Sequence, residues 1–98
     1  MKTVESILEY TAKPKSALYV YTSMCGTCQV AGKMLDVVEA MNTDVPLQRI
    51  NINYYEEIAH RFEIESVPCL LLFEQSVLKK KIYAFQSVPY IYEEIRSL

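Results

Sequence analysis

The chain contains 98 residues, the size of one small domain, so we expect a single domain spanning residues 1–98. Its apolar fraction of 51% excludes a disordered chain. Its formal net charge of −2 lacks the basic excess that nucleic-acid binding requires, so neither DNA nor RNA is an expected partner.

The N-terminal half predicts a helix, a strand and a longer helix. Apolar residues at helical spacing after a cap at Thr3 predict a first helix that ends before Pro14, because proline disfavours helical geometry in the preceding residue. Residues 17–22 are rich in aromatic and β-branched side chains and predict a buried strand. A long helix follows Cys25 and ends at residues 42–43. Its predicted core face consists of Val30, Met34, Leu35, Val38 and Met41.

The middle of the chain predicts a second strand and a third helix. Residues 47–52 have the strand pattern, and Asn53 with Glu56 resembles a capping box that opens a helix. A strand, a helix and a strand in succession predict a parallel, right-handed crossover.

The C-terminal part predicts a hairpin and a final helix. The apolar run at residues 69–73 is typical of a central strand that is covered on both faces. Residues 77–85 follow after a turn too short for a crossover, so these two strands should be antiparallel. Ser87 and Pro89 indicate the start of the last helix.

No segment reads as a targeting or membrane signal. No stretch has the roughly 7–15 apolar residues of a signal peptide or the ~20 of a spanning helix. We therefore expect a cytoplasmic protein that makes no membrane contact, and its net charge is compatible with a monomer. Three cysteines are an odd number for a structural framework in reducing cytosol, so the spacing of Cys25 and Cys28 indicates catalysis or metal binding.

A Cys-x-x-Cys motif at a helix start can open and close a disulfide with little adjustment. The Cβ atoms of a disulfide lie about 3.5–4.5 Å apart, and side chains three apart on a helix lie about 5–6 Å apart. Because Cys25 is expected where a strand ends and a helix begins, free amide groups and the helix dipole favour its thiolate. Cys28, one turn further, should be more buried and suited to attack a mixed disulfide from within.

Two other interpretations of the cysteines stay open at this level. The pair would be inert as a structural disulfide or as buried thiols. A zinc or iron–sulfur site usually needs four ligands, and the chain offers three cysteines and His60. His60 is expected in the middle of a helix elsewhere and has no assigned role, and we assign no metal ligand and no bound cofactor.

The chain resembles the thioredoxin-like superfamily over nearly its whole length, and the small bacterial thioredoxins in particular. The matching segments are residues 18–28, which contain the Cys-x-x-Cys motif, residues 49–53, and residues 64–73, which contain Val67-Pro68. Too few residues precede the first helix to supply the family's first strand. The resemblance therefore implies an α/β fold with a central mixed sheet of four strands flanked by helices.

The resemblance also implies the activity of a thiol–disulfide oxidoreductase that reduces protein disulfides. Cys25 would be the attacking cysteine and Cys28 the resolving one. Electrons would come from a partner reductase of the thioredoxin-reductase type, since the chain has no glycine pattern for binding a nucleotide itself.

The substrate surface is implied in the same way. Pro68 would be a cis-proline that faces the motif, and the backbone of Val67 would pair with an extended substrate peptide. Met24, Gly26 and Thr27 would contact the substrate beside the reactive sulfur.

Several positions depart from the family pattern. Tyr19 stands where the family has a buried aspartate, and a phenol cannot accept a proton from Cys28 at neutral pH as a carboxylate could. Met24 replaces a tryptophan, Thr27 a proline and Cys69 a threonine. Cys69 follows Pro68 and is either a small apolar core residue or a third thiol that exchanges with the pair or completes a metal site. These departures leave a second hypothesis, a peptide-binding or adaptor module with little turnover.

Overall fold

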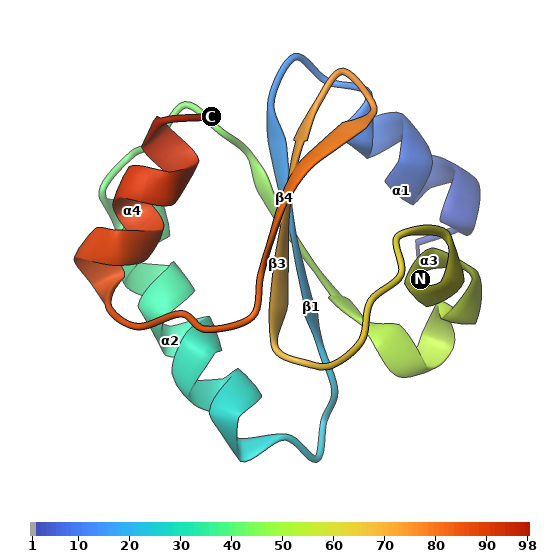
Figure 1. The fold of residues 1–98 in the computed structure, drawn as a ribbon, viewed down its shortest axis with the longest axis horizontal. Coiled ribbons are helices and arrows are strands. Elements are labelled where there is room, and N and C mark those ends of the chain that lie inside the picture. The colour runs from blue at the N-terminus through green and yellow to red at the C-terminus, as the bar shows by residue number, and fades with distance from the viewer. Residues whose placement is uncertain (1) are drawn as a thin grey trace.

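The computed structural model describes residues 2–98, which form helices packed around one sheet of strands (Figure 1). The helices are α1 (Val4–Thr11), α2 (Gly26–Ala40), α3 (Glu56–Arg61), α4 (Val88–Arg96) and the short 3-10 helix η1 (Ile52–Tyr54). The strands are β1 (Ser16–Tyr21), β2 (Leu47–Asn51), β3 (Cys69–Glu74) and β4 (Val77–Ile82).

Within the described residues, four strands form one mixed sheet in the order β2-β1-β3-β4. β1 pairs with β2 in parallel, and α2 connects them. β3 pairs antiparallel with both β1 and β4. The predicted four-stranded mixed sheet, with its parallel crossover and its C-terminal hairpin, is therefore confirmed.

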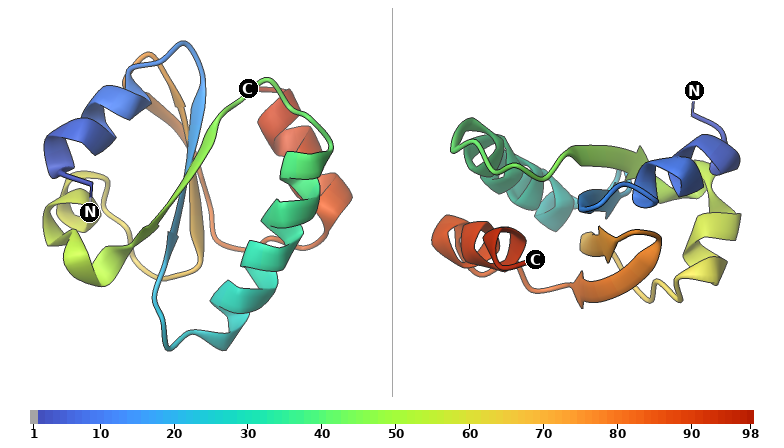
Figure 2. Two further views of the ribbon diagram at one scale, coloured as in Figure 1. Left: turned by 180° about the vertical axis from the view of Figure 1, so that it is seen from behind. Right: turned by 90° about the horizontal axis from the view of Figure 1, so that it is seen from above.

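Helices cover both faces of this sheet. α2 and α4 lie on one face, and α1 and α3 lie on the other (Figures 1 and 2). The face under α2 receives Tyr19 and Leu72, and the opposite face receives Leu18 and Leu71. Because successive residues of a strand point to opposite faces, β1 and β3 are buried on both sides, as the apolar run at residues 69–73 predicts.

The caps of the first and last helices confirm the sequence signals. The Thr3 side chain accepts a hydrogen bond from the Ser6 amide at 3.0 Å, and the Ser87 side chain accepts one from the Tyr90 amide at 3.2 Å. Each cap satisfies an amide that has no partner inside its helix.

The predicted core face of α2 is partly wrong. Leu35 and Val38 are buried, but Val30 is 57% and Met41 43% exposed. The remaining buried positions are taken by the smaller residues Cys28 and Ala31. Small side chains allow the start of α2 to approach the sheet closely, whereas the sequence pattern favoured the larger apolar residues.

The predicted capping box at Asn53 and Glu56 is also wrong. Asn53 lies inside η1, where its backbone amide donates to the Asn51 side chain at 3.0 Å. α3 begins at Glu56 after Tyr55, whose side chain makes no capping hydrogen bond. The helix η1 therefore contains the residue that the predicted capping box required as its N-cap.

The hairpin between β3 and β4 is tighter and its second strand shorter than predicted. Gln75 and Ser76 form the turn with φ angles of 47° and 72°, the two left-handed positions of a hairpin turn that matches strand twist. β4 ends at Ile82 rather than at the predicted Phe85, which is buried beyond the strand. None of the helices in residues 2–98 is long and apolar enough to cross a membrane.

Candidate active site

Cys25 and Cys28 form a disulfide where β1 leads into α2, with 5.1 Å between their Cα atoms. Cys25 is the N-cap of α2, and its Sγ accepts a hydrogen bond from the Cys28 backbone amide at 3.1 Å. Cys28 is 3% exposed, whereas Cys25 is partly exposed. One sulfur of the pair is therefore accessible to another molecule and the other is shielded, as the motif's position predicts.

The start of β3 lies beside this disulfide. Cys69 pairs with Val20 near the end of β1, and this register carries the preceding residues to the motif. The peptide bond between Val67 and Pro68 is cis. The Val67 carbonyl oxygen lies 4.0 Å from the Cys25 Sγ atom.

The residues around Cys25 form an exposed rim. Met24 is 96% exposed, and Gly26 and Thr27 are also exposed. The Thr27 hydroxyl oxygen lies 3.3 Å from the Cys25 Sγ atom. A Cβ atom on Gly26 would meet nothing within 4 Å, so the fold does not require glycine at this position.

An apolar groove of about 370 Å³ runs between the start of α2 and the segment that follows β4. Of the predicted substrate-binding residues, Thr27 and Pro68 line it, while Met24, Gly26 and Val67 lie outside its lining. Its other walls include Val30, Met34, Tyr83 and Phe85. Val30, which the sequence predicted in the core, is therefore exposed and lines a groove beside the disulfide.

Tyr19 contacts the buried side of the redox pair. Its hydroxyl donates to the Cys28 carbonyl oxygen at 2.6 Å, and its side chain is 2% exposed. Burial raises the pKa of Tyr19 to about 12, against an opposing effect of the Arg49 charge. The phenol is therefore neutral at physiological pH, and it holds the backbone of the shielded cysteine.

Arg49 is a site residue that sequence reasoning missed, since its only signal is a charge inside a predicted strand. It lies opposite Tyr19 in the β1–β2 register, and the two line a cavity of about 340 Å³ together with Cys28. Its guanidinium forms ion pairs with Asp36, at 2.8 Å, and with Glu39, both on α2. The positive charge of Arg49 beside the cavity is therefore already paired with these two carboxylates.

Cys69, the first residue of β3, belongs to the core cluster on the face of the sheet opposite α2. Its side chain is fully buried in the apolar cluster under α1 and α3. Burial raises the pKa of Cys69 to about 11, against smaller opposing effects of Tyr83 and Lys81. In residues 2–98, no three His, Cys, Asp or Glu side chains are grouped so that they could hold a metal ion.

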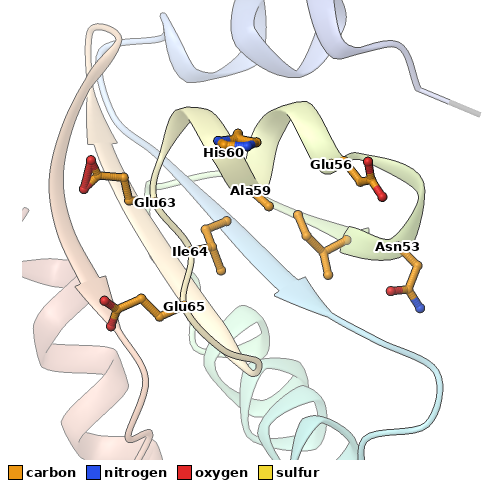
Figure 3. Close-up of a pocket in the computed structure, with 8 residues that line it drawn as sticks. Asn53, Glu56, Ala59, His60, Glu63, Ile64 and Glu65 are labelled. Carbon is orange, nitrogen blue, oxygen red and sulfur yellow. The ribbon is translucent and has the colours of Figure 1, made fainter.

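A wider hollow of about 680 Å³ contains His60 but lies away from the disulfide, between η1, α3 and the chain leading to β3. Figure 3 shows Glu56 at one end of this hollow and Glu63 and Glu65 at the other. These carboxylates therefore do not converge on one point of the hollow.

Comparison with solved structures places this architecture among known folds. A mutant thioredoxin from Halobacterium salinarum NRC-1 superposes with a TM-score of 0.87 and 19% identity, covering 99% of this chain and 86% of that one. The oxidised mitochondrial thioredoxin 3 of Saccharomyces cerevisiae gives a TM-score of 0.88 and 18% identity, covering 100% and 92% of the two chains. At these identities the likeness concerns the fold.

Sequence comparison extends the likeness to the family. The chain is 51% identical over 79 residues to the thioredoxin-like protein YusE of Bacillus subtilis, covering 81% of this chain and 74% of that protein. The family model described as thioredoxin matches residues 4–96. Together with the disulfide of Cys25 and Cys28, this match supports thiol–disulfide oxidoreductase chemistry in general terms. The chain belongs to the thioredoxin family.

Proposed function

We propose that this protein reduces disulfide bonds in other proteins, acting as a single domain of residues 1–98 in the cytoplasm. The observation that carries the proposal is the disulfide at the start of α2, with Cys25 accessible and Cys28 shielded. Its membership of the thioredoxin family supports protein disulfides as substrates and a thioredoxin-reductase-type protein as electron donor.

The reaction follows from this asymmetry. The Cys25 thiolate attacks one sulfur of the substrate disulfide, forming a mixed disulfide and releasing the other substrate sulfur as a thiolate. Cys28 then loses its proton and attacks the Cys25 sulfur, which releases the second substrate thiolate and closes the Cys25–Cys28 disulfide. The reductase returns two electrons to the pair. The Cys28 amide at 3.1 Å and the positive end of α2 stabilise the attacking thiolate of Cys25.

The substrate segment lies in an extended form across Pro68. The backbone of Val67, whose carbonyl oxygen is 4.0 Å from the reactive sulfur, pairs with this segment. Met24 and Gly26 contact it at the exposed rim. Thr27 and the apolar groove accept a side chain next to the substrate cysteine.

Proton release from Cys28 differs from that in a site with a buried carboxylate. Tyr19 is neutral and already donates its proton to the Cys28 carbonyl oxygen, so it accepts none at neutral pH. The cavity lined by Tyr19, Cys28 and Arg49 gives solvent a route to this side of the pair. Solvent therefore takes the proton of Cys28.

Cysteine variants test the proposal. With a thioredoxin reductase, NADPH and insulin as the disulfide substrate, wild-type protein should turn over and Cys25→Ser should not. Cys28→Ser should accumulate a covalent mixed disulfide with insulin. Cys69→Ala is the matched control, because it removes the cysteine on the other face of the sheet, and it should retain turnover.

Other outcomes point to the alternatives. Turnover by Cys25→Ser, or no trapped adduct with Cys28→Ser, would contradict the assigned roles. Redox-independent peptide binding without turnover would identify an adaptor module. Stoichiometric zinc or iron that is lost in Cys69→Ala would identify a metal site.

A further inference from the structure

The Cys25 sulfur has two hydrogen-bond donors and one acceptor around it. The Cys28 backbone amide lies at 3.1 Å and the Thr27 hydroxyl at 3.3 Å, while the Val67 carbonyl oxygen is more distant, at 4.0 Å. A sulfur in a disulfide carries no hydrogen, so the hydroxyl of Thr27 is the donor in its contact. Among the residues that the structure describes, the two groups that donate a hydrogen bond to this sulfur are both uncharged.

Reduction converts the sulfur that this hydroxyl contacts from a neutral disulfide sulfur into a thiolate. A dithiol reductant breaks the Cys25–Cys28 bond, becomes a disulfide itself and delivers two electrons and two protons. One proton stays on Cys28, and the other goes to solvent when Cys25 is a thiolate. A hydrogen bond to a charged acceptor is about twice as strong as one between neutral groups, so the same hydroxyl stabilises the reduced pair more than the oxidised pair.

We propose that the Thr27 hydroxyl donates a hydrogen bond to the Cys25 thiolate and raises the reduction potential of the pair, making it a weaker reductant than it would be without the hydroxyl. This inference deepens the proposed function and rests on it for its biological meaning. Backbone amides stabilise the thiolate in any helix N-cap, whereas the hydroxyl is a property of residue 27 in this chain.

The size of the effect follows from the exposure of the site. Thr27 is exposed, so part of the gain is offset by lost hydration of the hydroxyl and the thiolate. We therefore expect removal of the hydroxyl to shift the dithiol–disulfide equilibrium about tenfold toward the disulfide, which is a potential lower by about 30 mV. The ionisation constant of the Cys25 thiol should fall by about the same factor.

The experiment compares Thr27→Val, which keeps the branched shape without the hydroxyl, with Thr27→Ser, which keeps the hydroxyl. The equilibrium constant is measured against dithiothreitol by quenching and separating the two redox forms. The ionisation of Cys25 is measured from thiolate absorbance against pH in the Cys28→Ser background. Ser23→Ala is the matched control, because this neighbouring hydroxyl contacts the Asn51 side chain instead of the sulfur.

The expected result is a tenfold shift in both measurements for Thr27→Val and values close to wild type for Thr27→Ser and Ser23→Ala. Changes in helix propensity act on both redox forms and cancel in the equilibrium constant. Wild-type values for Thr27→Val, or equal values for Thr27→Val and Thr27→Ser, would overturn the inference. Because neither measurement uses a protein substrate or a reductase, failure of insulin reduction would contradict the proposed function and leave this result unaffected.

Discussion

Tyr19→Phe should lower the stability of the oxidised protein at neutral pH and raise it at strongly alkaline pH. The Tyr19 hydroxyl donates to the Cys28 carbonyl oxygen at 2.6 Å in a site that is 2% exposed. Phenylalanine keeps the ring stacked on Tyr21 and edge-on to Phe85 but loses this bond. A buried neutral hydrogen bond contributes about 1 kcal/mol, so the variant should melt about 4–8 °C lower at neutral pH.

The alkaline effect has the opposite sign. Burial raises the pKa of Tyr19 from 10.0 to about 12. Because the unfolded chain releases this proton at lower pH than the folded chain, stability that is fully present below about pH 10 is lost as the pH rises toward 12. At about pH 11.5 the loss is roughly 2 kcal/mol, which exceeds the contribution of the hydrogen bond. The stability curves of the two proteins should therefore cross at about pH 11.

Urea unfolding of both oxidised proteins, followed by circular dichroism over this pH range, measures the difference directly. Tyr54→Phe is the control, because it removes a hydroxyl from a residue that is 64% exposed, and it should have the stability of the wild-type protein. Parallel curves for wild type and Tyr19→Phe, or equal stability at neutral pH, would refute the reasoning.

Two further predictions concern Cys69 and the orientation of α2. Cys69 is fully buried, and its pKa is raised from 9.0 to about 11. Iodoacetamide should therefore label the native oxidised protein at least about a hundredfold more slowly than the urea-unfolded protein. Rapid labelling of the native protein would contradict the buried position of Cys69. Leu35→Ala, at a fully buried position of α2, should cost about 2–5 kcal/mol in urea unfolding. Val30→Ala, at a 57% exposed position, should change stability by less than about 0.5 kcal/mol, and similar losses for the two variants would show that the helix faces are assigned wrongly.

The order of the α-helices and strands could be predicted because their patterns are local, although the short helix η1 was not predicted. The apolar run at residues 69–73 is typical of a strand that is buried on both faces, and the short link to the next strand leaves no room for a crossover, which favours a hairpin. Thr3 and Ser87 act on amides within their own helix turn, so their caps need no tertiary information.

The sequence-based predictions were wrong where the result depends on the distance between packed elements or on a competing neighbouring residue. Ala31 is buried and Val30 is not, because α2 lies so close to the sheet that only small side chains fit between them. The hydrophobicity of the residues alone does not predict this distance. Asn53 does not cap α3, because its backbone amide already donates a hydrogen bond to the Asn51 side chain. A capping motif in the sequence does not reveal a competing acceptor two residues earlier.

The same limit applies at the active site. The sequence identifies Cys25 and Cys28 by their spacing, but the acceptor of the Tyr19 hydroxyl is a backbone carbonyl, which no residue type marks. Arg49 was missed for a similar reason, since its contacts with Asp36 and Glu39 depend on how α2 lies over β2. Side-chain contacts across elements require the fold to be known first.

The two hydroxyls at this site act on different halves of the disulfide. Tyr19 bonds the backbone of Cys28, and Thr27 contacts the sulfur of Cys25. Neither contact involves a charge in the oxidised protein, and the nearby Arg49 is matched by carboxylates on α2. Salt screens interactions between charges but has little effect on hydrogen bonds from neutral donors. The tenfold difference in the redox equilibrium between the wild-type protein and Thr27→Val should therefore persist at high ionic strength, because the interaction that this variant loses is a hydrogen bond from a neutral donor.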